Sequence, residues 1–128
     1  MPEPSPEHDR AAREIVDSAL AVHSTLGPGL LESVYEECLA YELRSRGLEI
    51  AAQVALPVVY REVTVDAGFR MDMVVSNLMV VEIKAVEKLM PIHEAQLLTY
   101  LKLSRKRLGF LINFNSGRVK DGIRRLIL

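Results

Sequence analysis

One segment, residues 78–86, constrains the fold more than any other part of the chain. It is apolar on both faces except at Glu82 and Lys84. An apolar run of this length, without polar alternation, is typical of a strand that is buried on both sides of its sheet. Helices must then cover both faces of that sheet, so the segment predicts an α/β fold with this strand near the centre.

The spacing of apolar residues predicts the other elements. Residues 6–26 and 31–47 have helical spacing, and the two helices are expected to end at Gly27-Pro28-Gly29 and at Gly47. Further strands are predicted at residues 50–60 (bent at Pro57), 63–75, 108–114 and 123–128, and a third helix opens at Pro91. The order is α-α-β-β-β-α-β-β, an α/β (α+β) mixed sheet with helices packed against it.

Length and composition favour a single soluble domain. The chain has 128 residues, of which 49% are hydrophobic and 26% charged, so residues 1–128 are expected to form one domain, with residues 1–6 flexible. No stretch approaches the roughly 20 apolar residues of a membrane span, and the acidic, proline-rich start is unlike a signal peptide. The single Cys38, expected in the core, cannot form an internal disulfide, so we expect a cytoplasmic protein without a membrane partner.

Glu82 and Lys84 are the first candidates for function. Their i, i+2 spacing places both on one face of the strand. A charged side chain in a buried strand costs several kcal/mol of desolvation unless it is paired or bound to a ligand. The pair is therefore either functional or part of a salt-bridge network with Asp72 of the preceding strand.

Asp72 meets Glu82 only in one register. A two-residue turn at Ser76-Asn77 would place Asp72 opposite Val81, whereas an odd-length connection or a bulge places it opposite Glu82. Two carboxylates with a backbone carbonyl, that of Ile83, suit a hard cation with oxygen ligands, Mg²⁺ or Mn²⁺. Lys84 would then orient or deprotonate the attacking water, or stabilise charge on a phosphate.

Two helices contribute further candidates. Gln96 and Tyr100 lie one turn apart on one face of the third helix and can bind a phosphate oxygen or a metal-bound water. Glu32 lies in the first turn of the second helix, where the helix dipole favours an anion. Each also has an ordinary explanation: Gln96 and Tyr100 as helix surface and core edge, Glu32 as a helix-start acid, and Tyr35 as a core aromatic.

The charge distribution favours a nucleic-acid partner at the C-terminal end. Residues 1–50 carry ten acids against four Lys/Arg, whereas from Lys102 onward eight Lys/Arg face only Asp121. Basic side chains bind phosphates by counterion release. A solvated face that balances the acidic half explains the charge equally well. The candidates for nucleic-acid contact are Lys102, Arg105, Lys106, Arg107, Arg118 and Lys120.

These motifs together resemble the PD-(D/E)xK nuclease superfamily, with Asp72 and Glu82-Ile83-Lys84 as its core motif. The segment from Gln96 to Tyr100 resembles the QxxxY helix of its RecB-like branch. Gly29-Leu-Leu-Glu32-Ser-Val-Tyr35 is similar to the motif that gives the GxxExxY family its name, and the likeness covers residues 10–128. One departure is Met71, which stands where the superfamily often has proline.

The resemblance implies a restriction-endonuclease-like core and a metal-dependent phosphodiesterase that cleaves DNA. It assigns Asp72, Glu82 and Glu32 to the metal, Lys84 to the water, and Gln96 and Tyr100 to the phosphate. The alternative is a catalytically silent module on the same fold that binds nucleic acid or protein. In either case a homodimer or a larger assembly is plausible for so small a domain, and His93, three residues before Gln96, is a peripheral candidate.

Overall fold

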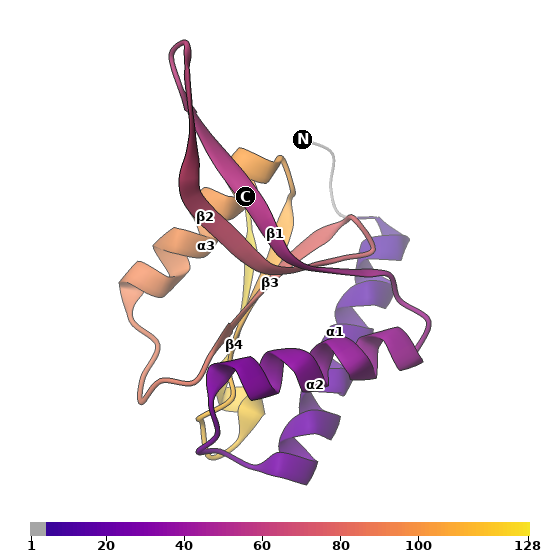
Figure 1. Cartoon of the computed structure of the whole chain (residues 1–128). Helices are drawn as coiled ribbons and strands as arrows, with labels where there is room; N and C mark the ends of the chain where they lie inside the picture. Colours follow the sequence, from indigo (N-terminus) through magenta and orange to yellow (C-terminus); the bar gives the residue numbers. More distant parts are fainter. Residues whose placement is uncertain (1–4) are drawn as a thin grey trace.

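The computed structural model describes residues 5–128, apart from the side chain of Ala67. The elements run in the predicted order, with one short 3₁₀ helix added before the last strand (Figure 1). They are α1 (Pro6–Leu26), α2 (Glu32–Ser45), β1 (Ile50–Tyr60), β2 (Val63–Val75), β3 (Met79–Lys84), α3 (Pro91–Ser104), β4 (Leu108–Asn113), η1 (Val119–Gly122) and β5 (Ile123–Ile127). The predicted mixed α/β architecture is confirmed.

The five strands form one sheet in the order β1-β2-β3-β4-β5. β3 and β4 are parallel and the other neighbours are antiparallel. α3 makes the crossover between the two parallel strands, as a parallel pair requires. β3 is the central strand that its apolar sequence predicts, and residues from Met79 to Ile83 are all buried.

Helices cover both faces of the sheet. On one face, α1 and α2 enclose a core cluster with Met73, Val81 and Ile83. On the other face, α3 packs over Val80 and Leu111. Glu82 and Lys84 share strand parity with Val80, so they belong to the α3 face.

The helix boundaries follow from local chemistry. The side chain of Ser5 accepts a hydrogen bond from the backbone N–H of His8 and caps α1, which begins at Pro6. Gly27 ends α1 with a φ of 68°, and Gly47 follows α2 with a φ of 87°, a region that favours glycine. Cys38 lies partly buried against the core of α1 and α2.

Three of the predicted strands are longer than the observed ones. β3 is shorter at both ends than residues 78–86, β4 ends one residue before 114, and β5 ends one residue before 128. The sequence at Val119–Gly122 gave no sign of its 3₁₀ helix. Of the residues expected to be flexible, 1–4 lie outside the described part of the chain, while Ser5 and Pro6 form the start of α1. Among residues 5–128 no helix is long and apolar enough to cross a membrane.

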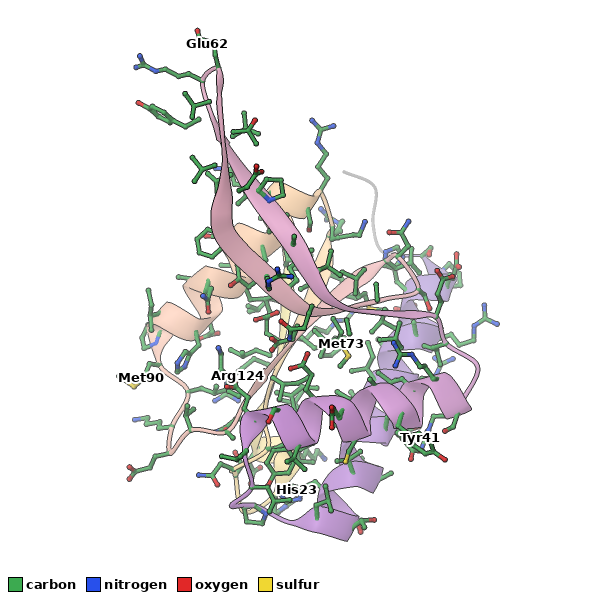
Figure 2. All side chains as sticks on the ribbon, viewed as in Figure 1. His23, Tyr41, Glu62, Met73, Met90 and Arg124 are labelled. Carbon is green, nitrogen blue, oxygen red and sulfur yellow. The ribbon has the colours of Figure 1, made fainter. Side chains whose placement is uncertain are left out.

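β1 and β2 extend well beyond the rest of the sheet. β2 pairs with β3 only from Met73 to Val75, whereas it pairs with β1 over almost its whole length. The distal part of this hairpin, residues 57–68, therefore projects as a two-stranded arm with Glu62 at its tip (Figure 2). A register shift at Pro57 marks the base of the arm, as the sequence predicted.

The hairpin changes sides of the molecule near Gln53 and Asp72. Ile50 packs in the cluster under α1 and α2, but Leu56, with the same parity, packs in the α3 cluster. On β2, Met73 packs in the cluster under α1 and α2, whereas Met71 packs in the α3 cluster. Residues two apart share a face in a regular strand, so the ribbon is distorted between these positions.

Replacing residues 57–68 by an Asn-Gly turn between the paired residues Leu56 and Phe69 should change the melting temperature by only a few degrees, because the arm pairs only with itself. Thermal unfolding followed by circular dichroism measures this. Met73→Ala is the control, since it removes a fully buried side chain at a typical cost of about 2–5 kcal/mol. An arm deletion as damaging as Met73→Ala would contradict the peripheral role of the arm.

Candidate active site

The register of β2 and β3 brings Asp72 opposite Glu82. The last paired residues at the turn are Val75 and Met79, so three residues connect the strands and the odd-length connection is confirmed. Continuing this register pairs Asp72 with Glu82, one step beyond the final ladder pair of Met73 and Val81. The two carboxylates therefore lie where β2 and β3 separate.

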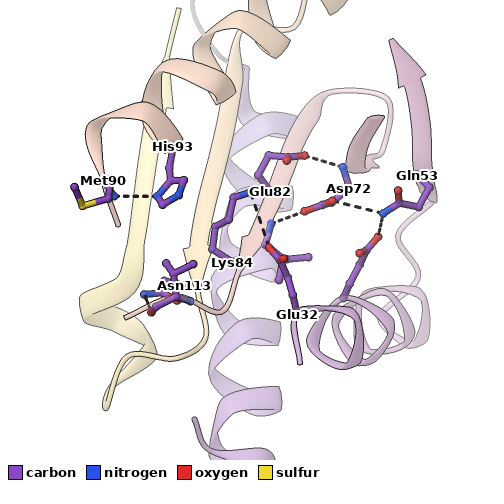
Figure 3. Close-up of polar contacts among 11 residues, drawn as sticks. Glu32, Gln53, Asp72, Glu82, Lys84, Met90, His93 and Asn113 are labelled. Atoms are coloured by element: carbon purple, nitrogen blue, oxygen red, sulfur yellow. Dashed lines mark hydrogen bonds and ion pairs between the residues drawn. The ribbon is translucent and has the colours of Figure 1, made fainter. Parts of the chain in front are cut away.

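Side chains replace the backbone ladder at this point. The backbone N–H of Asp72 donates to Glu82 Oε2 at 2.7 Å, and the backbone N–H of Ile83 donates to Asp72 Oδ2 at 2.8 Å (Figure 3). The N–H and C=O of a strand residue point to the same side, so the Ile83 carbonyl also faces β2. Two carboxylates and one carbonyl thus lie at the split, and the cation site expected there stays a prediction.

Burial makes the negative charge of this pair unfavourable. Glu82 is only 4% exposed, and burial, followed by the charge of Asp72, raises its pKa from 4.5 to about 8. Burial also raises the pKa of Asp72, although the hydrogen bond from Ile83 and the charge of Lys84 oppose this. A cation between the carboxylates would offset the charge of Asp72, which contributes to the raised pKa of Glu82 after burial.

Lys84 lies beside the carboxylates at the end of β3. Its Nζ is 3.9 Å from Glu32 Oε1 on α2 (Figure 3). Its carbonyl accepts a hydrogen bond from the Phe114 backbone, and the buried Asn113 amide binds both backbone groups of Val86. The backbone that carries Lys84 is thus tied to the end of β4.

Gly29 and Tyr35 place Glu32. The Tyr35 hydroxyl donates to the Gly27 carbonyl and accepts from the Leu30 N–H, while its ring stacks on Phe114 at 4.7 Å. Gly29 has a φ of 102° and donates its N–H to Asn115. The loop before α2 is therefore held against the end of β4, and Glu32 begins α2 facing Lys84.

Tyr100 and Gln96 lie on the α3 side of the site. Tyr100 is buried, and its ring contacts Phe69 at a centroid distance of 5.4 Å. Burial, with the nearby charges of Glu82 and Asp72, raises the pKa of Tyr100 to about 12. Gln96 is half-buried one turn earlier, and within residues 5–128 its side-chain amide has no hydrogen-bond partner. His93 begins the same helix, and its Nδ1 accepts the Met90 N–H.

Sequence reasoning missed two residues, Gln53 and Glu36. Gln53 Nε2 donates to Glu36 Oε1 and lies 3.5 Å from Asp72 Oδ1 (Figure 3). Burial raises the pKa of Glu36, and the hydrogen bond from Gln53 opposes the shift. Glu36 is one helical turn beyond Glu32, so its spacing offered a signal. The sequence gives no such signal for Gln53, because a polar residue in a strand of alternating polarity is expected on the solvent-exposed face.

The structure divides the basic candidates between two ends of the sheet. Because β3 and β4 are parallel and Lys84 aligns with Asn113, the exposed Arg118 and Lys120 follow β4 at the end where Lys84 lies. The other four precede β4, at the opposite end of a six-residue strand that spans roughly 20 Å. In that group Arg107 donates to the carbonyl of Leu128. The group at the opposite end comprises Lys102, Arg105, Lys106 and Arg107.

The comparison with protein families agrees with this geometry. The family model described as the PD-(D/E)XK nuclease superfamily matches residues 9–126, nearly the whole chain. The chain belongs to the PD-(D/E)XK nuclease superfamily. Neither the search of curated proteins nor that of solved structures finds a match. Membership implies a nucleic-acid substrate, and nucleases of this superfamily generally depend on a divalent metal.

The donors at the split of β2 and β3 fit such a metal in part. Within residues 5–128 no three His, Cys, Asp or Glu side chains gather closely enough to hold an ion by themselves. Asp72, Glu82 and the Ile83 carbonyl supply oxygen donors, while Glu32 is turned to Lys84. Magnesium is commonly bound through one or two carboxylates, with water and substrate phosphate completing its shell. A site of that kind suits this superfamily member better than an all-protein cage.

Glu82→Gln should stabilise the metal-free protein at high pH. The folded state holds the Glu82 proton up to a pH of about 8 and the unfolded state only to 4.5, so wild-type stability falls as pH rises between these values. With a chelator present, the variant should melt several degrees above the wild type at pH 8.5, and the difference should shrink at pH 5. Glu87→Gln, at an exposed position, is the control. A pH-independent difference would contradict the raised pKa of Glu82.

Proposed function

We propose that this protein is a metal-dependent nuclease that hydrolyses phosphodiester bonds in DNA. The observation that carries the proposal is the meeting of Asp72, Glu82 and Lys84 where two strands of a PD-(D/E)XK fold separate. Mg²⁺ or Mn²⁺ is the proposed ion, because the donors are hard oxygens.

Each residue has a proposed role. Asp72, Glu82 and the Ile83 carbonyl would hold the metal, with Glu32 as a further ligand or as the partner that orients Lys84. The bound ion would supply Lewis acidity at the phosphoryl group. The Lys84 ammonium has three donors, with which it orients the attacking water and stabilises the negative charge that develops on the phosphate.

Gln96 and Tyr100 complete the proposed site from α3. The amide of Gln96 would donate to a phosphate oxygen, and the hydroxyl of Tyr100, which stays protonated at neutral pH, would donate in the same way. His93, in the first turn of the same helix, would lie at the rim of the site.

Within the superfamily we place the chain in the GxxExxY family and the QxxxY branch. The support is the motif of Gly29, Glu32 and Tyr35, together with Gln96 and Tyr100. The contacts give this motif a physical meaning. Gly29 and Tyr35 hold a loop so that Glu32 reaches Lys84.

The proposed DNA contacts fall into two groups. Arg118 and Lys120, at the same end of the sheet as Lys84, would bind phosphates next to the scissile bond. Residues 102–107 would contact the backbone farther away. Such contacts position a duplex without reading its sequence and make binding sensitive to salt. A homodimer or larger assembly stays a prediction.

A catalytically silent binding module is the second candidate. It is favoured by the hydrogen bonds that Asp72 and Glu82 make to the backbone and by the Glu32–Lys84 ion pair, since these satisfy the charged groups without a metal. The two candidates differ in metal binding and turnover.

Asp72→Asn should abolish cleavage and weaken metal binding by more than the roughly 10–100-fold that is typical of losing a residue that only supports a ligand, because it removes a ligand charge at the centre of the site. Mn²⁺ titration by calorimetry and cleavage of mixed DNA and RNA substrates measure the two effects. Asp66→Asn, on the exposed arm of the same strand, is the matched control and should behave as wild type.

Three outcomes separate the candidates. Loss of both metal binding and cleavage in Asp72→Asn alone supports the nuclease. Full cleavage by Asp72→Asn would remove Asp72 from the mechanism. Wild-type protein that binds DNA but neither binds Mn²⁺ nor cleaves any substrate would establish the silent module.

A further inference from the structure

Gln53 has a backbone conformation that is unusual for a residue within a strand. Its φ is 51°, in the left-handed region, although it lies within β1 and is not glycine. Its neighbours Ala52 and Val54 pair regularly with β2, but Gln53 itself has no ladder partner. A non-glycine residue in this region is strained, and such strain often accompanies a functional site.

The side chain of Gln53 is directed at Asp72, a candidate metal ligand, and at Glu36 on α2. A glutamine amide has two N–H donors. In Gln53 one is directed at Glu36 Oε1 and one at Asp72 Oδ1, 3.5 Å away (Figure 3). The carbonyl of Gln53 meanwhile accepts a hydrogen bond from Arg70 Nη1 at 3.3 Å. Both the amide and the backbone of Gln53 are therefore held in place.

We propose that Gln53 is a positioning residue that fixes the carboxylate of Asp72 for metal binding. This inference rests on the proposed nuclease function. Asp72 Oδ2 is held by the Ile83 N–H, and Gln53 restrains the other oxygen, so the plane of the carboxylate is set from both sides. Hydrogen-bonded partners of this kind orient metal ligands and keep lone pairs directed at the ion.

Gln53 also joins α2 to the site. Glu36 is one helical turn from Glu32 on α2. Gln53 contacts Glu36, and Lys84 contacts Glu32. The side-chain amide of Gln53 is a neutral donor, so it holds the carboxylates of Glu36 and Asp72 close together without adding a charge. A charged donor in its place would compete with the cation for both acids.

Two variants separate the amide from the backbone. Gln53→Gly removes the amide and relieves the positive φ, whereas Gln53→Met removes the amide, keeps a side chain of similar length and leaves the strain. Both should bind Mn²⁺ about 10–100-fold more weakly than wild type, the usual effect of losing such a partner. Without metal, the melting temperature of Gln53→Gly should equal or exceed that of the wild type, although its Mn²⁺ affinity is lower.

Calorimetric Mn²⁺ titration and thermal unfolding of the full chain test the inference, with wild type and Asp72→Asn as references. Wild-type Mn²⁺ affinity in both variants would overturn the role of Gln53 and leave the nuclease proposal standing. Weakening in Gln53→Gly alone would overturn it too, because the backbone and not the amide would then matter. Wild-type protein that binds no Mn²⁺ would overturn both this inference and the metal-dependent function.

Discussion

Where β2 and β3 separate, two carboxylates take over the hydrogen bonds that a ladder would make. Asp72 binds the N–H of Ile83, and Glu82 binds the N–H of Asp72. A sheet can open only if its buried backbone donors find other acceptors, and these acids are the acceptors. Because Asp72 and Glu82 replace the ladder bonds, they lie side by side where little water reaches them. The separation of β2 and β3 and the proposed metal site therefore depend on the same two side chains.

The elements around the opening hold it from three sides. α2 contributes Glu32 through a loop that Tyr35 anchors to Phe114, and α3 contributes Tyr100 through its packing on Phe69. The third support is β1, whose Gln53 reaches Asp72. Ring packing helps to place Glu32 and Tyr100, whereas Asp72, Glu82 and Gln53 are oriented by hydrogen bonds.

Much of this was readable from the sequence. The apolar segment at residues 78–86 predicted a central strand, and the need to pair Asp72 with Glu82 predicted the odd-length connection that the register confirms. Both arguments rest on strand periodicity, which is strong in a buried strand. The position of Gln53 was not predictable, because its left-handed backbone follows from contacts with α2 and Arg70 and not from local spacing. The basic segment was read as one surface, but a strand lies between its two halves, and charge counted along a chain carries no information about that.

The projecting hairpin has a mechanical consequence. β2 is one continuous strand from the tip of the arm to Val75, and it carries Asp72 close to the point where the ribbon changes sides. The Gln53–Asp72 pair therefore lies between the arm and the part of β2 that pairs with β3. A partner bound to the arm would be joined to Asp72, the proposed central metal ligand, through the continuous backbone of one strand.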